Sequence, residues 1–182
     1  MRKEVTYQGL TFEPYISRDK IDARVKELGK QLTCDYAGKM PLFICVLNGA
    51  FPFASDLVRA YDADCEITFI RLKSYQGTSS TGVVKEILGL AEGVEGRDLI
   101  IVEDIVDTGR TLKRLIEDLR VKKPASIRTA TLLFKPEALE TDVHPDYVAF
   151  EIPKKFVIGF GLDLDGMARN LDDIYTLKVQ KD

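Results

Sequence analysis

The sequence has no tryptophan, one histidine and three cysteines. Cys34, Cys45 and Cys65 are widely spaced and form no C-x-x-C pair, so neither a disulfide framework nor a zinc site is indicated. Cys45 falls inside an apolar run and is expected to be a core residue. His144 precedes a proline in a predicted loop and has no cysteine beside it. The sequence therefore offers little material for Ser-His-Asp or Cys-His catalysis.

The chain also lacks a large charge surplus and a long apolar stretch. Its 26 Lys and Arg residues nearly balance its 29 Asp and Glu residues, which leaves a net charge of −3. The chain has no excess of basic residues that would indicate nucleic acid or an anionic membrane as a partner. No stretch approaches the length that spans a bilayer, and the start, MRKEVTYQGL, lacks the apolar run of a signal peptide. We expect a cytoplasmic protein with no membrane or nucleic-acid partner.

The composition is 45% hydrophobic and 30% charged, which is typical of a globular protein. A length of 182 residues favours one domain, and no linker, repeat or low-complexity tract divides it. Strand and helix patterns alternate along most of the chain. This alternation predicts an α/β fold with a mainly parallel twisted sheet flanked by helices, in which ligands bind at the carboxyl ends of the strands. Helices are predicted at 17–36, 51–61 and about 111–121, and strands at 42–47, 65–72, 83–90, 99–102, 126–134, 147–152, 156–162 and 174–179.

The most informative stretch is 99–119, LIIVEDIVDTGRTLKRLIEDL. Its first four residues predict a buried strand that ends at the acidic pair Glu103 and Asp104. A loop follows, and apolar residues then recur at the spacing of an amphipathic helix. The stretch contains no G-x-x-x-x-G-K-[ST] pattern, so a P-loop NTPase is not supported.

The loop of this stretch carries the candidate chemistry. A helix that begins near Thr111 leaves its first amides without backbone partners, and Gly109 would let the backbone close around an anion such as a phosphate. The acidic pair and Asp107 lie beside that loop, where they would repel a lone phosphate. A ligand with a phosphate and a diol, such as ribose 5-phosphate, together with a cation, would use both the anion-binding loop and the carboxylates. An ordinary strand-to-helix turn with a solvated acidic tip explains the loop about equally well.

The residues VEDIVDTGRT at 102–111 resemble the binding motif for 5-phosphoribosyl 1-diphosphate (PRPP) of type I phosphoribosyltransferases. The acidic pair followed by D-T-G-x-T is similar to the version in hypoxanthine-guanine phosphoribosyltransferases. The resemblance covers nearly the whole chain, and it implies the type I fold with a small hood region from the N-terminal residues and about 150–182. Further matches, in the family's order, are Leu47-Asn48-Gly49 to the pyrophosphate loop, 71–75 to the mobile lid, 134–136 to the segment of the purine-contacting lysine, and 156–163 with Arg169 to the purine-stacking and pyrophosphate-binding end.

The resemblance implies a salvage reaction in which hypoxanthine or guanine and PRPP give IMP or GMP and pyrophosphate. Asp107 is implied as the general acid/base at purine N7, although a turn residue that caps the following amides would look the same. Mg²⁺ is the implied cofactor, with Glu103, Asp104 and Asp163 as its ligands. The implied PRPP-binding residues are Glu103, Asp104, Asp107, Thr108, Gly109, Arg110 and Thr111.

The remaining implied roles concern the base, the lid and the pyrophosphate. Lys135 would donate to the purine 6-oxo group and Phe156 would stack on the base, while a surface lysine and a core phenylalanine are the plainer alternatives. Many relatives carry lysine where this chain has Asn48, and the resemblance allows a cis Leu47–Asn48 peptide bond. The other implied residues are Val157 and Asp163 beside the purine, Ser74 and Tyr75 in the lid, and Leu47, Gly49 and Arg169 at the pyrophosphate.

Three questions stay open at this level. Lys135 and Phe156 favour a 6-oxopurine but do not choose among hypoxanthine, guanine and xanthine. A transferase for another base, or a PRPP-binding regulatory protein of the same fold, is the alternative function. A homodimer or homotetramer is implied by the resemblance alone.

Overall fold

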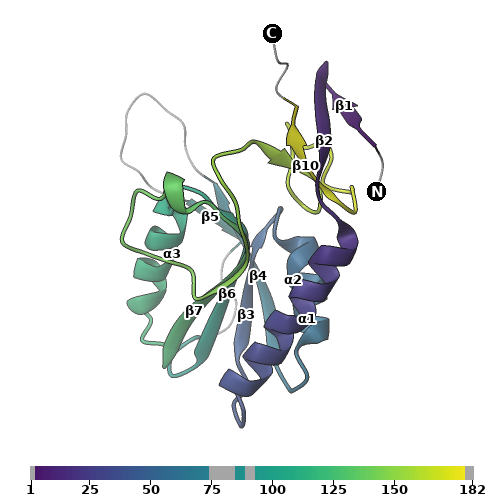
Figure 1. Ribbon diagram of the computed structural model, residues 1–182. Helices are drawn as coiled ribbons and strands as arrows, with labels where there is room; N and C mark the ends of the chain where they lie inside the picture. Colours follow the sequence, from purple (N-terminus) through teal and green to yellow (C-terminus); the bar gives the residue numbers. More distant parts are fainter. Residues whose placement is uncertain (1–2, 74–84, 89–92, 179–182) are drawn as a thin grey trace.

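The main sheet contains six strands in the order β5-β4-β3-β6-β7-β8 (Figure 1). Neighbouring strands pair in parallel from β4 to β8, and β5 pairs antiparallel with β4 at one edge. The computed structural model describes residues 3–73, 85–88 and 93–178. The mainly parallel sheet predicted from the alternating patterns is confirmed. The strands are β3 (Leu42–Leu47), β4 (Glu66–Lys73), β5 (Lys85–Leu88), β6 (Asp98–Val106), β7 (Ser126–Phe134) and β8 (Tyr147–Glu151).

Helices cover both faces of this sheet (Figure 1). Side chains alternate along a strand, so Phe43 and Cys45 of β3 join the core under two helices, whereas Leu42 and Ile44 join the core under the third. Strands that were predicted to be buried from their apolar runs thus pack against one hydrophobic core on each face of the sheet. The helices are α1 (Arg18–Asp35) and α2 (Phe51–Ala60) on one face and α3 (Arg110–Arg120) on the other, with a short 3₁₀ helix η1 (Pro136–Ala138) after β7.

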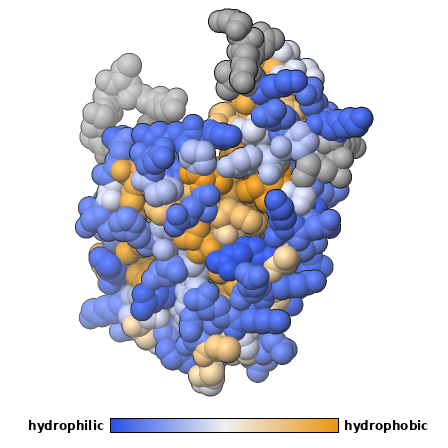
Figure 2. Space-filling view, in the orientation of Figure 1, coloured by the Kyte–Doolittle hydropathy of each residue, from blue (hydrophilic) through white to orange (hydrophobic). Residues whose placement is uncertain are grey.

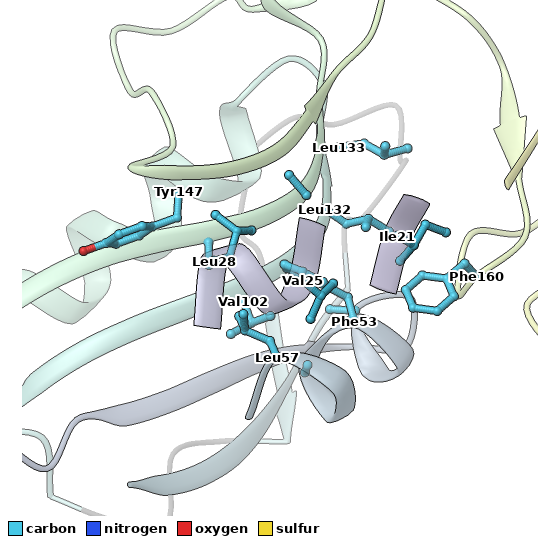
Figure 3. Packing of buried hydrophobic residues seen from close by; sticks show 14 of the residues in the cluster. Ile21, Val25, Leu28, Phe53, Leu57, Val102, Leu132, Leu133, Tyr147 and Phe160 are labelled. Carbon is cyan, nitrogen blue, oxygen red and sulfur yellow. The ribbon is translucent and has the colours of Figure 1, made fainter. Parts of the chain in front are cut away.

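Helix α1 has the N-cap and the apolar face that its sequence predicts. Ser17 is its N-cap, and the Ser17 hydroxyl accepts a hydrogen bond from the Lys20 amide at 3.4 Å. One face of the helix is buried against α2 and the sheet, as Figure 3 shows for part of this cluster. The predicted helix at 17–36 is therefore confirmed to within one residue at each end. The buried residues of this face are Ile21, Val25, Leu28, Gly29 and Leu32.

A second sheet is built from the two ends of the chain and lies above the main sheet in Figure 1. Its four strands are antiparallel, in the order β1-β2-β10-β9. Strands β1 and β2 were not predicted from the sequence; β2 pairs with β10 from the other end of the chain, with Phe12 opposite Leu177. The strands are β1 (Val5–Tyr7), β2 (Leu10–Ile16), β9 (Val157–Ile158) and β10 (Ile174–Leu177).

The strand predicted at 156–162 is wrong in length, because β9 contains only Val157 and Ile158. The next three residues, Gly159, Phe160 and Gly161, have φ values of 95°, 48° and 98°. A positive φ does not fit an extended strand, so the chain turns here. This turn carries the backbone from the second sheet toward the main sheet.

The face of the molecule in Figure 2 is mostly polar, with apolar side chains gathered near its centre. Within the described part of the chain, no helix has both the length and the hydropathy that a membrane span requires.

Candidate active site

The acidic pair lies inside strand β6, not after it. The prediction that the strand ends before Glu103 is wrong, because Ile105 and Val106 continue the parallel pairing with β7. The β-branched side chains of Ile105 and Val106 were the signal for the longer strand. The consequence is that Glu103 and Asp104 are held by a sheet, which fixes their backbone more firmly than a loop would.

Both carboxyl groups resist ionisation in this position. Burial, reinforced by the neighbouring Asp104 charge, raises the pKa of Glu103, whose side chain is almost inaccessible. Burial also raises the pKa of Asp104 to about 6, even though its carboxylate accepts a hydrogen bond from the Ile105 amide at 2.9 Å. The charge of Arg169 acts on Asp104 in the opposite direction. The pair is therefore a place where added positive charge would be strongly favoured.

The predicted phosphate loop connects β6 to α3. Gly109 has a φ of 76° and is the N-cap of α3, which begins at Arg110, one residue before the predicted start. The Thr108 hydroxyl accepts a hydrogen bond from the Arg110 amide at 3.4 Å. Thr111 follows on the exposed side of the first turn. A left-handed glycine before a helix N-terminus turns successive amides toward one point, as an anion site requires.

A neighbouring segment supports this loop, and the motif gave no sign of it. The Glu140 amide donates to the Thr108 carbonyl at 3.0 Å, and the Glu140 carboxylate pairs with the Arg110 guanidinium at 2.5 Å. A Cβ on Gly109 would lie 2.5 Å from Thr141 Oγ1 and 2.6 Å from Leu139 Cδ1. A side chain at position 109 would have to displace Thr141 and Leu139 and would also be strained at the positive φ.

The structure brings Asp107 and Lys135 together. They follow the last paired residues of two adjacent parallel strands, Val106 of β6 and Phe134 of β7. The Lys135 amide donates to the Val106 carbonyl at 3.0 Å, and Lys135 Nζ lies 2.8 Å from Asp107 Oδ2. The side chain of Lys135 is only 11% exposed, whereas that of Asp107 is 48% exposed. Lys135 is therefore not an ordinary surface lysine.

The segment Leu47-Asn48-Gly49 begins with the last residue of β3, at the same edge of the sheet. Its Leu47–Asn48 peptide bond is cis, and the side chain of Asn48 is exposed. A Cβ on Gly49 would lie 1.6 Å from Asp104 Oδ2, and a Cβ on Gly161 would lie 2.0 Å from the Gly49 carbonyl oxygen. Glycine is thus required at position 161, whereas a side chain at position 49 would have to displace the Asp104 carboxylate. Through these contacts the turn after β9 touches the end of β3 beside the acidic pair.

Arg169 and Asp163 form an ion pair next to this contact. Arg169 Nη2 lies 2.7 Å from Asp163 Oδ1, and Arg169 Nη1 donates to the Gly161 carbonyl at 2.7 Å. The second Asp163 oxygen accepts the Gly166 amide at 2.6 Å. The charges of Asp163 and Arg169 both influence the pKa of Asp104. The residues predicted for pyrophosphate from 47–49 and from 163–169 therefore lie in one neighbourhood.

Val157 begins β9 of the second sheet, and Phe156 directly precedes it. The ring of Phe156 is half-exposed and lies 6.1 Å from the ring of Phe12. Val157 is buried and pairs with Thr176 in the β9–β10 ladder. Core packing does not account for a half-exposed phenylalanine, and the exposed part of this side chain is accessible to a ligand. The predicted lid residues Ser74 and Tyr75 lie outside the described residues.

The donor set at the acidic pair fits a magnesium ion that arrives with a phosphate ligand. Among residues 3–73, 85–88 and 93–178, no group of three or more His, Cys, Asp or Glu side chains could hold a metal by itself. Mg²⁺ usually takes one or two protein carboxylates and completes its shell with water and substrate phosphates. Glu103 and Asp104 offer those two carboxylates, and a cation would offset the cost of their burial.

Comparisons with known proteins agree with this geometry. Residues 17–165 match the phosphoribosyl transferase domain family. The hypoxanthine-guanine phosphoribosyltransferase of Streptococcus thermophilus is 46% identical over 165 residues, which are 90% of this chain and 92% of that protein. Another relative, the enzyme of the same name from Streptococcus agalactiae, is 45% identical over 165 residues, which cover the same shares of the two chains.

Solved structures give the same result. The crystal structure of a hypoxanthine phosphoribosyltransferase from Staphylococcus aureus has a TM-score of 0.87 and 42% identity, and the match covers 91% of each chain. A hypoxanthine-guanine phosphoribosyltransferase from Bacillus anthracis has a TM-score of 0.85 and 37% identity, over 92% of this chain and 97% of that one. Sequence, fold and the arrangement of the strand ends thus agree, and the chain belongs to the phosphoribosyl transferase family, among its hypoxanthine-guanine phosphoribosyltransferases.

Proposed function

We propose that this protein transfers the 5-phosphoribosyl group of PRPP to a 6-oxopurine base, hypoxanthine or guanine, and releases pyrophosphate. The observation that carries the proposal is the pair Asp107–Lys135 at two adjacent strand ends, directly beside the loop at 107–111. A base placed over this pair would meet a proton acceptor and a hydrogen-bond donor within one small area. The family relationship supports the same reaction.

The proposed step is a substitution at the anomeric carbon of the ribose. The bond from this carbon to the pyrophosphate oxygen breaks, the bond to purine N9 forms, and the N7 proton passes to the Asp107 carboxylate. Lys135 donates to the purine 6-oxo group. Adenine carries an amino group there, and two donors would face each other, so Lys135 selects against adenine.

The phosphate end of PRPP is proposed to bind the amides and hydroxyls of 107–111. The left-handed Gly109, the threonine hydroxyls and the N-terminus of α3 suit a phosphate, and these groups act by positioning. The exposed Arg110 side chain is paired with Glu140, so Arg110 is proposed to contribute its backbone amide. Glu103 and Asp104 then face the ribose hydroxyls.

The pyrophosphate is proposed to bind at Leu47-Asn48-Gly49 and Arg169. Arg169 already presents its guanidinium at the contact between Gly161 and Gly49, and a guanidinium suits phosphate oxygens. When bound at Glu103, Asp104 or Asp163, Mg²⁺ would supply positive charge to the pyrophosphate and ribose oxygens. Asp163 would have to share its carboxylate between that ion and Arg169.

The second sheet is proposed to act as a hood over the base. Phe156 stacks on the purine, and Val157 offers backbone groups to its edge; the half-exposed ring of Phe156 supports this role. In this proposal residues 1–182 form a single domain whose hood comes from the N-terminal residues and about 150–182, and Ser74 and Tyr75 belong to its lid. The resemblance to the family further suggests a homodimer or homotetramer that works in the cytoplasm.

The test is a direct assay of nucleotide formation. The full-length protein is incubated with PRPP, Mg²⁺ and one base at a time: hypoxanthine, guanine, xanthine, adenine or uracil. We expect IMP and GMP and no AMP, and we expect the Asp107→Ala variant to be nearly inactive. No nucleotide with any purine would reject the transferase and favour a PRPP-binding regulator, while product from xanthine or uracil alone would reassign the base.

A further inference from the structure

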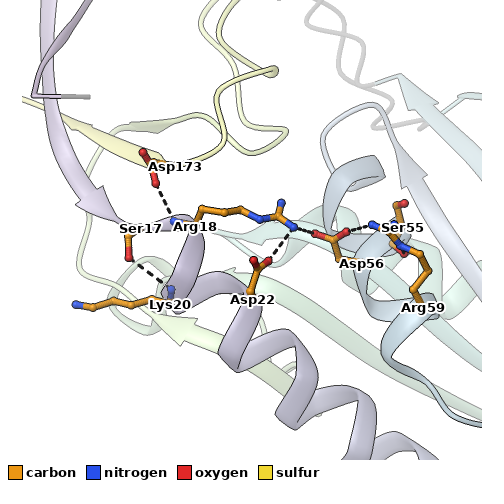
Figure 4. Close-up of polar contacts among 8 residues, drawn as sticks. All are labelled: Ser17, Arg18, Lys20, Asp22, Ser55, Asp56, Arg59 and Asp173. Atoms are coloured by element: carbon orange, nitrogen blue, oxygen red, sulfur yellow. Dashed lines mark hydrogen bonds and ion pairs between the residues drawn. The ribbon is translucent and has the colours of Figure 1, made fainter. Parts of the chain in front are cut away.

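Arg18 lies where the second sheet, α1 and α2 meet (Figure 4). It is the first residue of α1, two residues after the end of β2. Its backbone amide donates to Asp173 Oδ1 at 2.7 Å, and Asp173 is a buried residue just before β10. Its guanidinium Nη2 lies 2.6 Å from Asp56 Oδ2 of α2 and 2.7 Å from Asp22 Oδ1 of α1. One residue thus connects three elements.

The same guanidinium covers an aromatic ring from the turn after β9. The Arg18 Cζ atom lies 4.9 Å from the centre of the Phe160 ring. Phe160 is 2% exposed and belongs to the core cluster of α1 and α2, where Figure 3 shows it beside Ile21 and Phe53. A guanidinium on a ring face gains electrostatic and stacking energy, which increases as water is excluded. Arg18, whose side chain is 36% exposed, therefore lies over the buried Phe160 ring and connects it to α2 through Asp56.

Phe160 is directly joined to the contacts of the pyrophosphate half of the site. The next residue, Gly161, touches the Gly49 carbonyl so closely that a Cβ would not fit. The Gly161 carbonyl accepts a hydrogen bond from Arg169, and the Gly161 amide donates to the Arg169 carbonyl at 3.0 Å. If Phe160 moved, Gly161 would move with it, and the relation of Arg169 to Gly49 would change.

We infer that Arg18 is a positioning residue for pyrophosphate binding, acting through Phe160 and Gly161; this inference rests on the proposed function. Arg18 itself need not touch the substrate. Its planar guanidinium holds the turn at 159–161 against α2, and so sets the distance between Arg169 and the loop at 47–49. The phosphate loop at 107–111 is supported from another side, by Glu140 and Thr141. Arg18 should therefore affect one half of the PRPP site and leave the other unchanged.

The experiment compares two probes on full-length Arg18→Gln. Calorimetry with Mg²⁺ measures the dissociation constant of pyrophosphate, which probes the half near Arg169, and of ribose 5-phosphate, which probes the phosphate loop. We expect pyrophosphate to bind roughly tenfold more weakly and ribose 5-phosphate to bind within about twofold of wild type, because small displacements of positioning groups are costly. A general loss of folded protein would lower the binding capacity for both probes equally.

Arg59→Gln is the matched control. Arg59 pairs with the same Asp56 carboxylate at 2.5 Å, but it belongs to α2, is 73% exposed and lies one turn away on the same helix. The substitution is chemically the same and breaks the same kind of ion pair without touching the turn at 159–161. We expect wild-type affinity for both probes.

Arg18→Lys is the second variant, since lysine keeps the charge beside Asp56 but loses the flat stacking surface. We expect an intermediate loss of pyrophosphate affinity, about threefold. If Arg18→Gln does not fold, the two affinities measured for Arg18→Lys test the inference. Unchanged pyrophosphate affinity, or an equal loss for both probes, would overturn the inference. Wild-type protein that forms no nucleotide from PRPP and a purine would instead reject the proposed function, so the two failures are distinguishable.

Discussion

Lys135 Nζ lies 2.8 Å from Asp107 Oδ2, so the two side chains proposed to handle the purine form an ion pair with each other. Lys135 is the more buried partner. A purine that bridges them must take over part of this contact: its 6-oxo group accepts from Lys135 and its N7 proton faces Asp107. The ion pair thus gives the mostly buried Lys135 ammonium group a charged hydrogen-bond partner.

Replacing Lys135 with methionine should weaken binding of the base. Methionine has a similar length and no hydrogen-bond donor, so the contact to the 6-oxo group is lost. A hydrogen bond to a charged group is worth about 1.5–3 kcal/mol, which corresponds to a rise of roughly 10- to 100-fold in KM for hypoxanthine. Steady-state kinetics at saturating PRPP measures this KM. An unchanged KM would assign 6-oxo recognition to another group.

Replacing Asp107 should slow the chemical step. Asp107→Ala is expected to lower kcat by roughly 10²- to 10⁴-fold with little change in PRPP affinity, because the acceptor for the N7 proton is removed. Asp107→Asn is the companion variant, since its amide oxygen can still accept from Lys135 while the proton-accepting carboxylate is gone. Both variants should be slow. A near-normal kcat in either one would mean that Asp107 does not move the proton.

Gly109→Ala should disturb both stability and PRPP binding. The alanine Cβ would meet Thr141 and Leu139 at 2.5–2.6 Å, in addition to the strain of a positive φ. Gly38→Ala is the control: Gly38 has nearly the same φ, 74°, but nothing within 4 Å of a new Cβ. Urea unfolding should show a loss of about 1 kcal/mol for Gly38→Ala and about 1–3 kcal/mol more for Gly109→Ala.

Only Gly109→Ala is expected to raise the KM for PRPP, by roughly tenfold, because only that substitution moves the phosphate loop. Equal stability losses for the two variants would show that residues 139–141 shift to make room for the new methyl group at little cost in free energy.

Stability should depend on pH through Asp104. Burial raises its pKa in the folded chain to about 6, whereas an aspartate in an unfolded chain titrates near 4. Between about pH 4 and pH 6 the folded chain holds a proton that the unfolded chain has lost. Stability therefore falls as pH rises through this window, and the loss persists above it. At pH 8 the folded protein contains a buried charge that costs free energy.

Asp104→Asn removes that charge and keeps an oxygen that can accept from the Ile105 amide. Without Mg²⁺, in the presence of EDTA, we expect the variant to raise Tm by several degrees at pH 8 and by nearly nothing at pH 4. Thermal unfolding followed by circular dichroism gives both values. An equal gain at both pH values would exclude charge burial as its cause.

Asn48→Lys should strengthen pyrophosphate binding. The side chain at position 48 is exposed, so a lysine fits without displacing the core, and its charge would add to that of Arg169. We expect product inhibition by pyrophosphate at about three- to tenfold lower concentration, an effect that weakens as salt is added. No change in inhibition would show that position 48 does not contribute to this subsite.

Patterns confined to one segment predicted the main sheet well. The runs at 42–47 and 126–134 are buried β-branched or apolar strands, and the structure gives them the same bounds. The end of β6 was predicted wrongly, because two consecutive carboxylates usually mark a strand end. The pairing with β7 that carries Glu103 and Asp104 into the sheet depends on a strand more than 20 residues away.

The candidate site could be predicted only as a set of separate pieces. The motif at 102–111 indicates where the phosphate loop lies, and resemblance to the family indicates Lys135. The contact of Lys135 with Asp107, however, follows from the register of two strands. The supports of the site, such as Glu140 behind the loop and Arg18 over Phe160, belong to no motif and depend on packing between distant segments.

The adjacency of β6 and β7 has a consequence for evolutionary change in this protein. The spacing between Asp107 and Lys135 is set by a parallel backbone ladder, Val106 opposite Phe134, whose strand separation is nearly the same in all sheets. Core side chains beneath it can drift in size without changing that separation. Substitutions elsewhere in the core can therefore leave the placement of Asp107 and Lys135 unchanged, because it depends on hydrogen bonds that no side chain makes.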